Sequence, residues 1–174
     1  MIRNCHLITR ALSVTANLRA PSGKVKTAVE SVPSAAGDPL ARRAGLEPPG
    51  EGEALVTQAL AEDLELNSGE SLRVYISRKK DGKNEGASES FNVRGILPRS
   101  LNARAAVYLP LEAVTAMEDY RDGFNPRLFS DGSAPNPGRV SYAKARIYAR
   151  TLEDVPPLDQ KLRQRFRIAE IGRA

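Results

Sequence analysis

Hydrophobic and polar residues alternate near the start of the chain. In the stretch ITRALSVTANL, residues 8–18, the apolar positions fall on one side with only Arg10 as an interruption: Ile8, Leu12, Val14, Ala16 and Leu18. A period of two residues is typical of a half-buried strand, so one long strand is predicted over 8–18. After a turn at APSG, the stretch KVKTAVES alternates again and predicts a second strand.

The middle of the chain predicts a connection, a helix and two strands. Residues 31–53 are rich in Pro, Gly and Ala, and DPLARRAG within them predicts a helical turn capped by Asp38 with Pro39 at its first position. Thr57 is placed to cap a longer helix that stops near NSG. Strands are predicted at SLRVYIS and FNVRGILP, joined by a polar hairpin in which DG favours a tight turn.

The second half repeats a strand–helix order. A strand is predicted at ARAAVYLP, a helix from Leu111 toward Gly123, a Pro/Gly loop, a strand over 141–150 and a helix after Thr151 or Asp154. That order is typical of α+β folds. We therefore predict a two-lobed α+β fold, in which a helix plus β-rich subdomain over 54–100 is inserted between flanking segments 1–53 and 101–174.

Chemistry-bearing motifs are sparse. The chain has one cysteine, Cys5, and one histidine, His6, too few for a zinc site or for most Ser–His and Cys–His catalytic groups. No Gly-rich phosphate-binding motif occurs, and the Glu–Asp pairs lie on predicted exposed helix faces. We expect a non-enzymatic protein with no catalytic residue, no metal and no cofactor.

The net charge of +5 raises the possibility of a nucleic-acid partner. The basic residues are scattered, however, and only SRKKDGK groups them. Nucleic-acid binders concentrate cations on one face beside aromatic side chains. A freestanding basic nucleic-acid-binding module, with SLRVYISRKKDGK as the hairpin of a small barrel, is therefore the alternative prediction, and no nucleic acid is the main one.

Three stretches in a fixed order carry a resemblance to a known family. ALVTQALAEDLELNSGESLRVYI, FNVRGILP and AAVYLPLEAVTAMEDY resemble the periplasmic domain of FtsX-like permeases of ABC transporters, the MacB-type core. Further stretches, PSAAGDPLARRAG, EDYRDG and YAKARIYARTLEDVPPLDQKL, look like a proteobacterial branch of uncharacterised ABC permeases. The resemblance covers the chain from about residue 6 onward, and it is the order and spacing of the stretches that make it specific.

The resemblance implies a fold, a place and a role. The expected fold is a porter-like α/β sandwich lobe, formed by both chain ends, with the smaller β-rich lobe inserted. The expected place is the periplasm, as a segment excised from an inner-membrane protein, because no apolar run here approaches the roughly 20 residues that cross a bilayer. The expected role is to couple ATPase-driven transmembrane motion to export or extraction of a hydrophobic substrate (lipoprotein, lipid or drug). Force transmission to a cell-wall hydrolase system is a further role within the family.

Partners follow from the same resemblance. A cognate ABC ATPase would act through the missing transmembrane part, a periplasmic adaptor or lipoprotein could bind, and the full permease would form a homo- or heterodimer. The resemblance transfers no catalytic residue. The proposed partner-contact residues are Arg78, Lys79 and Lys80 in the charged hairpin, and Pro135 and Pro137 in the Pro/Gly loop.

Overall fold

The computed structural model describes residues 5–9, 14–130, 132, 134–135, 146–149 and 151–165. Twelve elements occur there in chain order: β1 (Cys5–Thr9), β2 (Val14–Arg19), β3 (Val25–Ser34), α1 (Pro39–Arg43), β4 (Glu53–Thr57), α2 (Gln58–Leu64), β5 (Ser71–Lys80), β6 (Lys83–Leu97), β7 (Ala106–Pro110), α3 (Leu111–Arg121), β8 (Arg146–Ala149) and α4 (Val155–Arg165).

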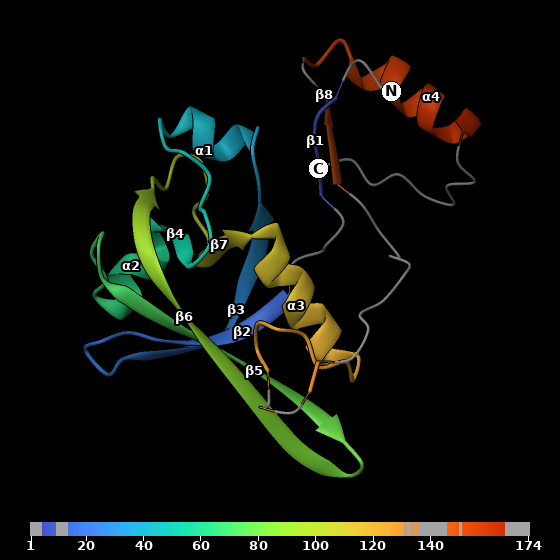
Figure 1. Ribbon diagram of the computed structural model, residues 1–174. Helices are drawn as coiled ribbons and strands as arrows, with labels where there is room; N and C mark the ends of the chain where they lie inside the picture. The colour runs from blue at the N-terminus through green and yellow to red at the C-terminus, as the bar shows by residue number, and fades with distance from the viewer. Residues whose placement is uncertain are drawn as a thin grey trace.

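Six of these strands close a barrel in the order β2-β3-β7-β4-β6-β5 (Figure 1). The sheet is mixed: β3 pairs with β7 and β4 with β6 in parallel, whereas the other neighbours are antiparallel. Closure removes the exposed sheet edges that an open sheet of these strands would carry.

The predicted porter-like sandwich with a separate inserted lobe is wrong. Strands from the flanking segments, β2, β3 and β7, are direct neighbours of strands from the central segment, β4 to β6, in one closed sheet. The reason is β4, which pairs with both β6 and β7 and was not predicted, together with β5, which pairs with β2. The boundaries at 53/54 and 100/101 stay a prediction, and β4 spans the first of them.

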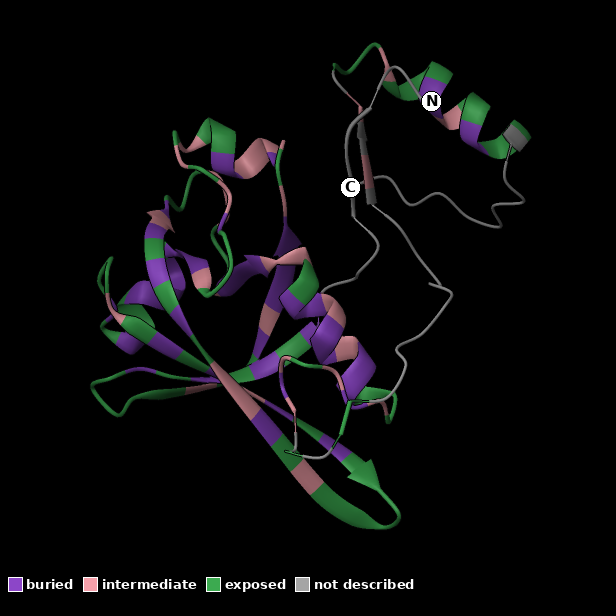
Figure 2. Ribbon diagram, in the orientation of Figure 1, coloured by how far each residue is buried: buried purple, intermediate pink, exposed green. Residues whose placement is uncertain are grey.

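Buried and exposed residues alternate along the barrel strands (Figure 2). Two apolar clusters form on the two sides of the barrel wall. The larger one takes alternate residues of the strands and the buried faces of α2 and α3, among them Leu18, Val56, Leu60, Leu72, Val74, Val107 and Met117. Helix α2 packs on β3, β4, β6 and β7, and α3 packs on β2, β3, β5 and β7, so the helices cover different strand sets. The smaller cluster lies outside, where α1 covers β3, β4 and β7: Val32, Ala41, Leu55, Leu97, Ala106 and Tyr108.

Local sequence signals explain how the helices start. Asp38 caps α1 by accepting a hydrogen bond from the Leu40 amide at 2.9 Å, and Pro39 is its first residue. Thr57 caps α2, as predicted. Gly95 in β6 lies under the chain that follows α1, where an added Cβ would come within 3.1 Å of the Leu46 side chain. Only glycine therefore permits this close approach without a shift of Leu46.

The two strands of the β5–β6 hairpin extend beyond the predicted stretches SLRVYIS and FNVRGILP. Their ladder runs unbroken from Ser71 opposite Asn92 to Lys80 opposite Lys83, through the polar stretch predicted as the hairpin connection. At the turn, Asp81 and Gly82 both have positive φ, 50° and 79°, which matches a type I′ hairpin. Residues 76–91, called the arm below, lie beyond the pairing with β2 and β4, and the arm projects from the barrel in Figure 1.

Strands β1 and β8 form a separate two-stranded antiparallel sheet, and α4 follows β8. The single long strand predicted over 8–18 is thus two elements in different sheets, with residues 10–13 outside the described part. Leu158 and Leu162 of α4 are buried. None of the helices in the described ranges has the length and apolarity that a membrane crossing requires.

The hydroxyl group of Thr57 joins three parts of the barrel, which makes it a test of the fold. Its Oγ1 accepts hydrogen bonds from the Ala106 amide at 3.0 Å and the Leu60 amide at 3.4 Å, and donates to the Ala106 carbonyl at 3.3 Å. Thr57→Val would leave these buried groups unsatisfied and should lower the free energy of unfolding by about 1–3 kcal/mol in urea denaturation.

Thr115→Val is the matched control, because the Thr115 hydroxyl only donates back to the Leu111 carbonyl within α3. Loss of this hydroxyl group should lower the free energy of unfolding by less than about 1 kcal/mol. Equal losses for the two variants would contradict the bridging role assigned to Thr57.

Candidate interaction surface on the barrel and its arm

The residues proposed from sequence as partner contacts lie in different environments. Lys79 and Lys80 are exposed at the end of β5, close to the turn of the arm, and Pro135 is exposed in the loop after α3. Arg78 is only 6% exposed. Pro137 lies outside the described residues. Partner contact by Lys79, Lys80 and Pro135 stays a prediction, whereas Arg78 is turned toward the interior of the chain.

Arg78 holds the arm against the end of α3. Its Nε donates to Glu85 Oε2 at 2.8 Å, across the β5–β6 ladder. Its Nη1 donates to the carbonyls of Tyr120, at 3.2 Å, and Phe124, at 2.6 Å. The guanidinium carbon lies 4.0 Å from the centre of the Tyr120 ring, which adds a cation–π contact. One side chain thus joins the arm to the Tyr120 carbonyl in the last turn of α3, which also accepts from the Gly123 amide at 3.1 Å, and to the Phe124 carbonyl just beyond the helix.

The alternation of β5 explains why Arg78 faces inward. Leu72, Val74 and Ile76 are buried, so the next position of the same parity, Arg78, falls on the same side. The sequence contained this signal, because the period-two pattern of SLRVYIS continues through SRK. The three residues of RKK were instead proposed together as partner contacts, and only the two lysines are exposed.

A second contact holds the root of the arm. The Phe129 amide donates to Glu89 Oε1 at 3.2 Å, and the Phe129 ring lies 6.3 Å from that of Phe91, centre to centre. Phe129 itself is fully buried. The loop after α3 therefore packs along the inward face of the arm, so that arm, loop and helix make one body.

On the opposite, outward face of β5, two arginines flank a tyrosine. Arg19 of β2 lies opposite Arg73 of β5, and Asn17 lies opposite Tyr75. Hydrogen bonding by Arg73, with the positive charges of Arg73 and Arg19, lowers the pKa of the Tyr75 phenol below its ordinary value of 10.0. Sequence reasoning missed this group, because its members come from strands whose register the sequence alone does not give.

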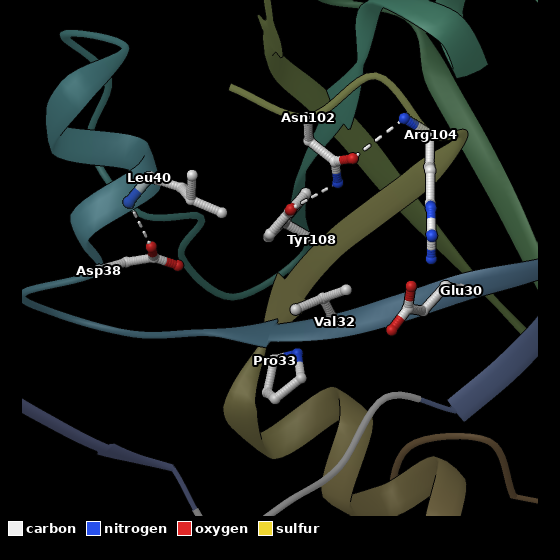
Figure 3. A pocket seen from close by; sticks show the side chains of 8 residues that line it. All are labelled: Glu30, Val32, Pro33, Asp38, Leu40, Asn102, Arg104 and Tyr108. Atoms are coloured by element: carbon white, nitrogen blue, oxygen red, sulfur yellow. Dashed lines mark hydrogen bonds between the residues drawn. The ribbon is translucent and has the colours of Figure 1, made fainter. Parts of the chain in front are cut away.

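A pocket of about 320 Å³ lies between α1 and the outer side of β3 and β7 (Figure 3). Its lining residues are Glu30, Val32, Pro33, Asp38, Leu40, Asn102, Arg104 and Tyr108. In Figure 3 the ends of Arg104 and Glu30 point toward one another across the pocket. Asp38 accepts from Ser34 Oγ at 2.6 Å as well as from Leu40, and Asn102 Nδ2 donates to the Tyr108 hydroxyl at 2.9 Å. These polar groups fasten α1 and the loop before β7 to the barrel.

No group of three or more His, Cys, Asp and Glu side chains within the described ranges could hold a metal ion.

Comparison with models of known protein families and with curated proteins found no match.

Arg78→Met should detach the arm from α3 and lower the free energy of unfolding by about 3 kcal/mol, because Glu85 loses its cation and the Tyr120 and Phe124 carbonyls each lose one donor. Arg78→Lys should recover little of this loss, since an ammonium group lacks the planar fork. The exposed neighbour provides the control: Lys79→Met should change stability by less than about 0.5 kcal/mol. Equal effects at 78 and 79, in denaturant unfolding and amide exchange of the arm, would show that Arg78 is no anchor.

Arg73→Gln should raise the pKa of Tyr75 toward 10.0, because it removes the main hydrogen-bond donor and the nearest cation. A phenol whose pKa is lowered in the folded state contributes stability that is present above the unfolded pKa and lost as pH falls through the folded one. The titration can be followed by NMR of ring-labelled tyrosine. Arg42→Gln on the distant α1 should leave the Tyr75 pKa unchanged, and an unchanged value in the Arg73 variant would contradict the assigned cause.

Proposed function

We propose that this chain is an extracytoplasmic domain of an ABC transporter permease, which transmits ATPase-driven motion through protein contacts. The observation that carries the proposal is the ordered set of stretches at residues 54–76, 91–98 and 105–120. In the structure these stretches are β4–α2–β5, the barrel end of β6, and β7–α3. They thus supply four of the six barrel strands and both helices that pack into the larger core, which is the part of a module least free to vary in order and spacing.

The mechanism would be rigid-body movement. The barrel has one apolar core shared by α2 and α3, and Arg78 fixes the arm to α3. The antiparallel pairing of β1 and β8 places the segments on either side of the barrel next to each other. A displacement applied through β1 and β8 would therefore carry barrel and arm together, as in hinge or rigid-body transitions of packed domains.

In this role the chain needs no reactive group. ATP hydrolysis would occur on a separate cytoplasmic subunit, and the exported or extracted molecule would be hydrophobic, a lipoprotein, lipid or drug. The contacts would be made with the second permease of a dimer and with a periplasmic adaptor or lipoprotein. The arm supports this assignment because a projecting element with an anchored root can transmit force without bending at its base.

The natural reading frame gives the first test. It should encode an apolar stretch of roughly 20 residues before this segment and several after it. The protein encoded by that frame, carrying Lys79→Cys in a Cys5→Ser background, is expressed in cells whose outer membrane is then permeabilised and whose inner membrane stays intact. In these cells the cysteine at position 79 should react with a membrane-impermeant maleimide. Leu72→Cys, whose side chain is buried, is the unreactive control.

Two results would overturn the proposal. One is a frame that opens at Met1 and closes after Ala174. The other is labelling of position 79 only after the inner membrane has been broken.

A further inference from the structure

We propose that the outward face of β2, β5 and β6 binds an acidic, extended segment of a partner protein. This face consists of the outward-pointing positions of the three strands, centred on Arg19, Arg73, Tyr75 and Lys79. The inference rests on the proposed function, because it names the chemistry of a partner in the contacts through which the chain would act.

The face carries positive charge without any negative charge. The outward positions of the three strands run from Thr15 to Arg19, from Ser71 to Lys79 and from Asn84 to Asn92, and they include no Asp or Glu. The acids of β6, Glu85 and Glu89, point inward, where they bind Arg78 and the Phe129 amide.

Several cations elsewhere on the barrel have acidic partners. Lys24 pairs with Glu65, Lys26 with Asp63 and Arg94 with Glu53, each at 2.8 Å. Within the described part of the chain, none of the three cations of the outward face makes such a pair. Arg73 contacts only neutral groups, the Tyr75 phenol and Ser90 Oγ at 3.4 Å. Opposite arginines also repel one another across a strand pair, so an incoming carboxylate would relieve a strain that the free chain carries.

The spacing of the charges fits an extended peptide. Arg73 and Lys79 are six residues apart on one strand, a separation of about 20 Å at 3.3 Å per residue. Between them, small residues form the floor of the face: Ser77, Gly86 opposite it, and Ser88 opposite Tyr75. A partner strand could therefore lie close to the sheet, with carboxylates at both ends and hydroxyl groups below its backbone. Guanidinium groups bind carboxylates with two parallel hydrogen bonds, which favours Arg19 and Arg73 as the stronger end.

The same face is a poorer fit for single-stranded nucleic acid. Platforms for successive bases use successive aromatic side chains, and the outward positions of these strands provide one, Tyr75. A polypeptide needs only one ring, which can pack on an aliphatic or aromatic side chain beside the carboxylate. Charge complementarity, a single ring and a floor of small polar residues together favour the acidic peptide.

The test is fluorescence anisotropy with a labelled eight-residue peptide of alternating Glu and Ser, titrated with the whole chain at low salt. Arg19→Gln with Arg73→Gln should weaken binding at least tenfold, and Lys79→Gln should weaken it severalfold. A four-residue peptide of the same composition should be insensitive to Lys79→Gln, because it cannot span the face. Arg42→Gln with Arg43→Gln, which removes two exposed charges from α1, is the matched control and should change affinity less than twofold.

Oligothymidylate of eight nucleotides and phosphatidylglycerol vesicles are the competing probes. If either binds more tightly than the peptide and loses that binding in the Arg19/Arg73 variant, the face takes a nucleic acid or a lipid surface, and the proposal is overturned. It is also overturned if the peptide does not bind, or if both double variants lose affinity equally. Thermal unfolding of each variant confirms that it is folded. If the peptide does not bind but position 79 is labelled by maleimide with the inner membrane intact, only the acidic partner is rejected. If the peptide binds as expected but position 79 is labelled only after the inner membrane has been broken, only the permease is rejected.

Discussion

The buried guanidinium group of Arg78 is the contact on which the shape of this protein depends. A cation removed from water must have its donors satisfied, and Arg78 finds acceptors in one acidic side chain, one carbonyl at the end of α3 and one just beyond it. The carbonyl end of a helix is also its electronegative end, so the charge and the helix stabilise each other. Because β5 extends from the barrel into the arm, this contact makes the arm part of the same body as the helix.

Barrel closure depends on β4, a strand that the sequence pattern did not predict. Ala54, Leu55 and Val56 form a short apolar run directly before a strong helix, and such a run does not reveal its secondary structure by periodicity. The cap at Thr57 was predicted correctly, and a cap residue has extended backbone, so the residues before it had to lie outside the helix. Once β4 exists, all three of these apolar residues are buried, on both sides of the wall. Because β4 joins strands of the central segment to a strand of the flanking segments in one sheet, a sandwich with a separate inserted lobe cannot form.

Elements defined by local chemistry were predictable, and contacts defined by register were not. The caps Asp38 and Thr57, the Asp81–Gly82 turn and the inward face of Leu72, Val74 and Ile76 all follow from nearby residues. The neighbours Arg19 and Arg73 are far apart in the chain and meet only because β2 pairs with β5. Arg78 lies between these cases: its inward position follows from alternation, but its acceptors at and just beyond the end of α3 come from tertiary packing.

The two faces of the β5–β6 hairpin divide the charge between them. On the inward face, Arg78 and Glu85 neutralise each other, and Glu89 receives the Phe129 amide. The outward face retains its cations, because the acids that could pair with them are used on the other side of the same strands. The anchor at Arg78 also fixes β5 and β6 in place before any partner arrives, so little ordering of the arm remains to oppose binding. The contacts that make the arm rigid thus leave a preorganised positive face, and an acidic partner would complete the pairing that the chain leaves open.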